Sequence, residues 1–243
     1  MQSSPSLIST LVKQARQTFA NLLSTEEPKS NPNEQIESIK RLMNKITKYE
    51  VNFTLFDHIH TNERLSPVEE RNLEKFLKSN APVFYMKVYE DKIISVGIFI
   101  IKSHHRIPLH DHPHMFGLIK VLDGHGHLNA YNVLFEKNAN ELVCTQHVSS
   151  SISCQSETAV LYPNQSNIHE IYASDDDHCA FLDILSPPYS NENDCTCFLA
   201  IPSSTTTTTD VTDDREGNYV LKRIFDDEYY TESLQYTGPT ISL

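Results

Sequence analysis

Hydrophobic periodicity changes near residue 83 of this 243-residue chain, from a helical repeat to short runs rich in β-branched and aromatic residues. The first two runs, Val83–Tyr89 and Ile93–Ile101, are separated by Glu90 and Asp91, which is a hairpin signal. Eight further strand candidates follow: Gly117–Leu122, His127–Phe135, Glu141–His147, Ala159–Tyr162, Glu170–Ala173, Ala180–Leu185, Thr196–Ile201 and Tyr219–Phe225. Many short strands with turns between them predict a mainly β body, either a sandwich or a barrel.

The N-terminal third of the chain has a helical pattern instead. Apolar residues recur at helical spacing over Ser6–Leu23 and again over Asn33–Tyr49. A third helix is predicted to begin after Ser66, because Ser66 and Glu69 form a capping box, and to end near residues 79–80. Three amphipathic helices therefore precede the strands.

We expect residues 1–80 to pack as a helical portion on a barrel formed by residues 81–243, so that the chain makes one structural domain. The first helix carries Lys13 and Arg16 but no acidic residue, and this composition overlaps with that of a mitochondrial transit peptide. We favour a helix packed on the barrel over this alternative. The polar, low-complexity stretch Ser203–Asp214 is predicted to be a mobile loop.

Charge, hydropathy and cysteine content limit the classes of partner and compartment. The net charge is 20 − 32 = −12, so a face that binds nucleic-acid phosphates is not expected. No apolar run approaches the length of a membrane span, so no membrane insertion is expected. The five cysteines are an odd number without a CxxC pair, which favours reduced thiols in the cytoplasm, with the nucleus and the mitochondrion as alternatives.

Histidine is the informative excess, because seven of the 12 histidines lie between residues 104 and 127. His110 and His112 are two residues apart, so in a strand both imidazoles point to the same side. Two such imidazoles form half of a site for Fe, Zn, Cu or Ni. The pairs 112/114 and 125/127 have the same spacing. Pro113 limits the strand beyond His112 and favours 110/112, whereas 125/127 flank Gly126 and look more like a turn.

A third imidazole comes from a distant segment. The Pro-containing turn Leu161–Ser166 leads into a strand whose first residues include His169. A histidine at such a junction can point into an antiparallel barrel beside the HxH pair. His110, His112 and His169 are therefore the candidate metal ligands, and the alternative is that these histidines lie on solvated loops.

Three stretches resemble the cysteamine (2-aminoethanethiol) dioxygenase and plant cysteine oxidase family of cupins: Ile107–Gly124, Leu161–Ala173 and Cys179–Ser190. The resemblance extends from about Val83 to Leu199. It implies a cupin double-stranded β-helix, which is a jelly-roll barrel, with N-terminal helices packed on it.

The same resemblance implies the family's chemistry. Non-haem Fe(II) would be bound by His110, His112 and His169, without the glutamate that many cupins place after HxH. His114 stands where relatives carry a small or acidic residue and is a competing ligand, although Pro113 argues against it. The implied activity uses O2 to convert cysteamine, or the N-terminal cysteine of a protein or peptide, to a sulfinate, with oxygen sensing as one consequence. A monomer is expected.

Asp183 lies in an otherwise apolar strand, in which alternation puts Phe181, Asp183 and Leu185 on one face. Because a buried carboxylate without a partner is costly, we expect Asp183 to face the metal pocket, where it holds a hydrogen bond or the substrate's ammonium group. The alternative is a cap on the turn before Pro187. Tyr189 either lines the pocket mouth through its hydroxyl or plugs the space under that turn.

Cys195 is the last candidate site residue. Animal cysteamine dioxygenases can join a Cys and a Tyr two residues later by a thioether. Cys195 matches the Cys, but Cys197 stands in place of the Tyr, so that crosslink is not available at these positions.

Arginine is scarce in the β body, where only Arg106, Arg215 and Arg223 occur. Because an arginine would bind the carboxylate of free cysteine, this scarcity favours an amine-bearing thiol as the substrate.

Two other functions stay open from the sequence alone. One is a metal-dependent cupin of another class, an isomerase or a hydrolase that uses Zn or Mn. The other is a non-catalytic cupin that binds a small ligand or a partner protein, for which the three histidines would be dispensable.

Overall fold

The computed structural model describes residues 5–24, 31–57, 64–190, 194–203, 218–225 and 229–243. The helices are α1 (Leu7–Leu22), α2 (Pro32–Met43) and α3 (Pro67–Lys78). The strands are β1 (Val83–Glu90), β2 (Ser95–Ile101), β3 (Arg106–His110), β4 (Phe116–Asn138), β5 (Glu141–Ser153), β6 (Ala159–Leu161), β7 (Ile168–Ala173), β8 (Cys179–Ser186), β9 (Cys197–Pro202), β10 (Asn218–Ile224) and β11 (Thr231–Ser233). The predicted mobile loop lies, except for Ser203, outside the described residues.

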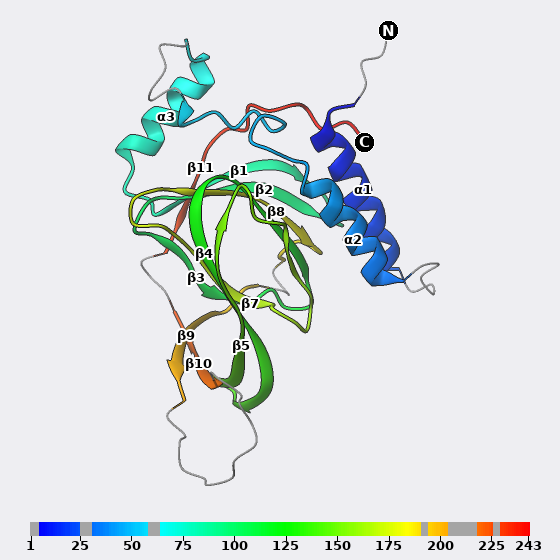
Figure 1. The fold of residues 1–243 in the computed structure, drawn as a ribbon, viewed down its shortest axis with the longest axis vertical. Helices are drawn as coiled ribbons and strands as arrows, with labels where there is room; N and C mark the ends of the chain where they lie inside the picture. The colour runs from blue at the N-terminus through cyan, green and yellow to red at the C-terminus, as the bar shows by residue number, and fades with distance from the viewer. Residues whose placement is uncertain (1–4, 25–30, 58–63, 191–193, 204–217, 226–228) are drawn as a thin grey trace.

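The strands form two sheets that share β4 (Figure 1). One sheet has the order β11-β1-β2-β8-β4, and β6 also pairs with β4. In the other sheet β4, β5, β10, β9, β3 and β7 follow one another, and β7 pairs back with β4 to close a ring. The pairings are antiparallel except that of β1 with the short β11. The predicted mainly β fold, a double-stranded β-helix preceded by helices, is confirmed.

The long strand β4 runs through both sheets because it bends at two glycines. Its first half pairs with β8, and its second half pairs with β5 and β7. Gly124 has a φ of 74°, and a Cβ there would lie 2.0 Å from the carbonyl oxygen of His178. At Gly126 a Cβ would lie 2.8 Å from the sulfur of Cys179. The prediction of two strands with a turn around 125–127 is therefore wrong. Because Gly124 and Gly126 have no side chains, β4 passes close to the neighbouring chain at His178 and Cys179 and continues as one strand.

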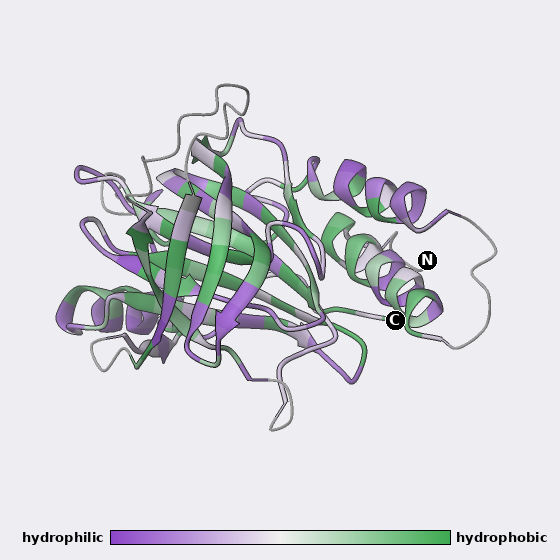
Figure 2. Ribbon diagram, turned by 90° about the horizontal axis from the view of Figure 1, so that it is seen from below, coloured by the Kyte–Doolittle hydropathy of each residue, from purple (hydrophilic) through white to green (hydrophobic). Residues whose placement is uncertain are grey.

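Strand β8 is buried on both faces. Ala180, Leu182 and Ile184 belong to the largest core cluster, together with apolar residues of α1, α2, β1 and β2. The alternate residues, including Phe181 and Asp183, line a cavity inside the barrel. The N-terminal helices therefore cover the outer face of the first sheet, and Figure 2 shows hydrophobic residues on the strands and on the helices beside them.

The helix boundaries agree with the sequence except at the end of α2. The Glu69 N–H donates to the Ser66 hydroxyl at 3.3 Å and the Ser66 N–H donates to the Glu69 carboxylate at 2.8 Å, which completes the predicted capping box. Helix α2 stops short of the predicted end at Tyr49. Asn44 caps α2, and its side chain accepts hydrogen bonds from Thr158 at 2.7 Å, a tertiary contact that the local pattern does not contain. Within the described ranges, no helix combines the length and the apolar character that a membrane span needs.

Candidate metal centre

Two of the predicted ligands are direct neighbours across a pair of strands. His110 is the last residue of β3, and its cross-strand partner in β7 is His169. Directly paired residues of antiparallel strands project to the same face, which here is the barrel interior. The two imidazole centroids are 4.7 Å apart. Cys197 of β9 pairs with His110 from the other side, so three side chains with metal-binding chemistry form a row across the sheet.

His112 reaches the same place from beyond the strand. The predicted strand does not extend to His112, because β3 ends at His110 and the chain then turns at His114, whose φ is 59°. The His112 N–H donates to the side-chain oxygen of Asn167 at 2.9 Å, which holds this turn against the segment that leads into β7. The centroid of the His112 ring lies 4.7 Å from that of His110 and 4.9 Å from that of His169.

The structure thus brings the three predicted imidazoles together. Their ligand nitrogens all lie within 4.8 Å of one another, which is close enough to hold one metal ion. His112 and His169 are buried, and His110 is half-buried. Burial lowers the pKa of all three imidazoles, so each ring is neutral and keeps one nitrogen lone pair for a cation. His114, the competing ligand, is exposed and lies outside this group.

Hydrogen bonds select the nitrogen that carries the lone pair in two of the rings. Nδ1 of His110 lies 2.8 Å from the carbonyl oxygen of Pro108, so Nδ1 donates and Nε2 keeps the lone pair. The Tyr189 hydroxyl donates its one hydrogen to the carbonyl oxygen of Asp111 at 2.9 Å and accepts from Nδ1 of His112 at 2.6 Å. The phenol of Tyr189 therefore fixes His112 in the form whose Nε2 carries the lone pair.

Among the three candidate ligands, two buried ring nitrogens form no hydrogen bond with the described residues. They are Nε2 of His112 and Nδ1 of His169. A buried polar atom without a hydrogen bond is costly, and a ligand that accepts its lone pair removes that cost. The donor set and the unsatisfied atoms together fit a metal ion coordinated by imidazole nitrogens.

A cavity of about 150 Å³ opens beside the imidazoles, inside the barrel. Its described lining is mostly apolar, contains Asp183 as a carboxylate and includes no Lys or Arg, so Arg106 does not enter it. Asp183 is buried, and burial raises the pKa of its carboxyl group to about 7. The lining residues are Phe99, Ile107, Pro108, His110, His112, Ile119, His169, Phe181, Asp183, Leu185, Tyr189, Cys195, Cys197 and Tyr229.

The sequence patterns did not single out two aromatic residues of this lining. Phe99 faces the cavity from β2 and stacks on Phe181 with a centroid separation of 5.5 Å, and alternation along β2 is a signal that could have placed it there. Tyr229 precedes β11, and no local pattern links it to the histidines.

The pKa values of two groups in this wall are raised. Burial, and then the neighbouring Cys195 and Cys197, raise the pKa of the Tyr229 phenol. Burial likewise raises the pKa of the Cys195 thiol to about 11, so this thiol stays protonated at neutral pH.

Comparison with known proteins adds a family and several relatives. A family model described as PCO_ADO matches residues 42–241, which include all three histidines. The chain is 31% identical over 213 residues to the 2-aminoethanethiol dioxygenase of Mus musculus, covering 79% of this chain and 78% of that protein. It is 31% identical over 131 residues to plant cysteine oxidase 1 of Arabidopsis thaliana, covering 51% of this chain and 44% of that protein.

Solved structures are similar over part of the barrel. One is an uncharacterized conserved protein with a double-stranded β-helix domain from Klebsiella pneumoniae, with a TM-score of 0.38 and 16% identity over 56% of this chain and 97% of that chain. Another is a cupin superfamily protein from Desulfitobacterium hafniense, with a TM-score of 0.32 and 13% identity over 53% of this chain and 94% of that chain.

Proposed function

The chain belongs to the PCO_ADO family, and from this membership we propose that it is a thiol dioxygenase, an enzyme that transfers both atoms of O2 to a thiol sulfur and so forms a sulfinate. Its relatives include proteins named 2-aminoethanethiol dioxygenase and plant cysteine oxidase. The observation that carries the proposal for this chain is the convergence of His110, His112 and His169 beside an internal cavity.

The metal that we propose for this site is Fe(II), held by the three imidazoles. Neutral nitrogen donors leave the charge of the ion undiminished, and three of them leave coordination positions for other ligands. Fe(II) bound there would supply the place at which a thiolate and O2 meet. The unpartnered Nε2 of His112, on a ring whose Nδ1 is held by Tyr189, supports a cation at this position. Tyr189 acts as a positioning residue, because its phenol oxygen holds His112 in the required tautomer.

The substrate class that best fits the cavity is a thiol with an ammonium group, either cysteamine or the N-terminal cysteine of a peptide. Asp183 places a carboxyl group in the wall, and an ammonium beside it would favour its charged form and offset the cost of burying it. Free cysteine also brings a carboxylate, for which the described lining offers no Lys or Arg. The cavity therefore favours a substrate whose positive charge is not accompanied by a negative one.

The size and the walls of the cavity agree with such a substrate. A volume of about 150 Å³ is comparable to that of an engineered apolar cavity that holds a benzene-sized molecule, and a cysteamine or a single cysteine is of that order. The stacked rings of Phe99 and Phe181 form an apolar part of its wall. If the substrate is the N-terminal cysteine of a protein, its oxidation depends on O2 and the enzyme acts as an oxygen sensor.

Anaerobic loading with Fe(II), followed by exposure to O2, tests the proposal. The substrates are cysteamine and a peptide that begins with cysteine, and the readouts are O2 consumption and a mass gain of two oxygen atoms on the thiol. His169→Ala should lose both iron and sulfinate formation. His127→Ala changes a histidine of β4 that lies outside the cavity and contacts Ser149 at 3.0 Å, and this variant should behave as wild type. Iron-loaded protein that oxidises neither thiol would refute the proposal.

A further inference from the structure

A second, open cavity of about 280 Å³ adjoins the metal cavity. The two share Pro108 and Tyr229, which line both of them. We call this second cavity the outer groove. The remaining described residues of its lining are Asn80, Pro82, His104, His105, Arg106 and Tyr230.

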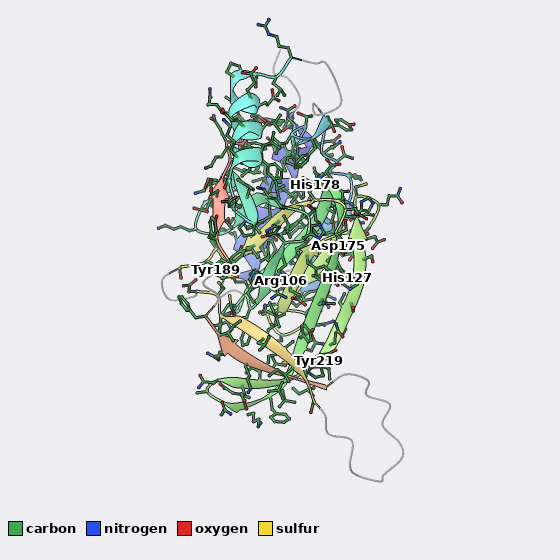
Figure 3. All side chains as sticks on the ribbon, turned by 90° about the vertical axis from the view of Figure 1, so that its left-hand side faces the viewer. Arg106, His127, Asp175, His178, Tyr189 and Tyr219 are labelled. Atoms are coloured by element: carbon green, nitrogen blue, oxygen red, sulfur yellow. The ribbon has the colours of Figure 1, made fainter. Side chains whose placement is uncertain are left out.

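Strand β3 leads from the outer groove to the candidate metal ligands. Arg106 lines the groove, Pro108 lines both cavities and His110 lines the metal cavity. These residues are spaced two apart, although the register of β3 against β7 shifts between Ile107 and His110. Figure 3 shows Arg106 on the same side of the molecule as Tyr189, which belongs to the wall of the metal cavity. A peptide whose first residue enters the metal cavity can therefore leave along this groove.

The outer groove carries positive charge in a chain whose net charge is −12. The Arg106 guanidinium is a cation with five N–H donors, whereas no Asp or Glu is among the described lining residues. Two carboxylates contact these side chains from outside the described lining: Glu170 lies 3.7 Å from the Arg106 guanidinium, and Asp175 lies 3.3 Å from the His104 ring.

Arg106 has capacity for a further partner. Its side chain is 60% exposed, and its contact with Glu170 is longer than a hydrogen bond. Glu170 already accepts a hydrogen bond from Asn129 at 2.9 Å. A guanidinium presents five N–H donors in a plane that matches a carboxylate, so the exposed part of Arg106 suits an acidic side chain from another molecule.

We propose that the outer groove binds the residues that follow the N-terminal cysteine of a peptide substrate, and that Arg106 selects an acidic side chain there. The inference rests on the proposed function and specifies its substrate class. Residues 106 and 110 are about 13 Å apart in an extended strand, at about 3.3 Å per residue. An extended peptide covers most of that distance in three residues, and the two facing side chains span the remainder. The third or fourth residue of the peptide is therefore the one that meets Arg106.

Two peptides that differ only in charge test this inference. One begins Cys-Gly-Asp-Asp and the other begins Cys-Gly-Lys-Lys, and each is compared by kcat/KM with the wild-type enzyme. Exposed ion pairs are modest in strength, so the acidic peptide should be preferred by about fivefold at low salt, and the preference should shrink as salt screens the pair. Arg106→Gln should bring the ratio of the two kcat/KM values close to one. Arg41→Gln, which changes an exposed arginine of α2, should keep the wild-type ratio.

A wild-type ratio near one, or a preference that persists in Arg106→Gln, would overturn the inference. Oxidation of cysteamine in the same preparation shows whether the proposed function holds, so the two failures are distinguishable. Fluorescence anisotropy with labelled versions of both peptides is a readout that does not require turnover. Tighter binding of the acidic peptide that depends on Arg106 supports the groove even in an inactive preparation, and equal binding of both peptides refutes it.

Discussion

Replacing Asp183 by Asn should remove a large pH dependence from the stability of the metal-free protein. Burial raises the pKa of this carboxyl group from 3.8 to about 7, which is a difference of about 3 pK units. At 1.36 kcal/mol per pK unit, the folded state loses about 4 kcal/mol when the group is forced to ionise.

The sign follows from where the proton is held. Between about pH 4 and pH 7 the folded protein keeps the Asp183 proton while the unfolded chain has released it. The free energy of unfolding therefore falls as the pH rises through this window, and it is independent of this group below and above it. D183N cannot ionise, so its stability relative to wild type should increase from about pH 4 to about pH 7 by up to about 4 kcal/mol.

Urea unfolding at several pH values, with metal removed by a chelator, measures this difference. D175N, at an 85% exposed carboxylate outside the cavity, is the control for the loss of one negative charge. A D183N advantage that does not change between pH 4 and pH 7 would show that Asp183 ionises freely in the folded protein. The argument that burial holds the Asp183 carboxyl protonated would then be lost.

Three further outcomes are expected. Y189F removes the oxygen that accepts a hydrogen bond from the His112 ring, so it should weaken metal binding by about 10- to 100-fold in a chelator competition assay. The control is Y172F, at a tyrosine of comparable exposure outside the cavity, which should bind metal as wild type does. G124A should destabilise the protein by about 2 kcal/mol or more in urea unfolding, because it combines a left-handed backbone with a Cβ 2.0 Å from a carbonyl oxygen. An unchanged unfolding midpoint would contradict the role given to Gly124 in strand β4. Fe(II) at about 100 times its dissociation constant should stabilise wild type by about 2.7 kcal/mol, and H110A should show no such gain in an anaerobic thermal scan.

Local patterns in the sequence predicted much of the architecture. The capping box at Ser66 and Glu69 marks the start of α3 because both partners lie within one helical turn. The alternation in β8 assigned Phe181 and Asp183 to the opposite face from Leu182, since side chains of a strand alternate regardless of what surrounds them. Such features depend on residues a few positions apart, and the chain itself carries them.

Other features of the fold depend on contacts between distant segments. The end of α2 coincides with a contact between Asn44 and Thr158, and in β4 Gly124 closely approaches His178. Neither partner is near the other in the sequence, so helical or strand periodicity alone assigns the wrong boundary in each case.

The candidate metal centre divides in the same way. Local spacing identified the available imidazoles, because His110 and His112 are two residues apart and a turn directly precedes His169. Three features of the centre depend on folding: the turn of His112 against Asn167, the tautomer of His112 beside Tyr189, and the groove with Arg106 next to the cavity. Strand register and the path of a bend are set by packing across the whole barrel, and a pattern of neighbouring residues does not contain that information.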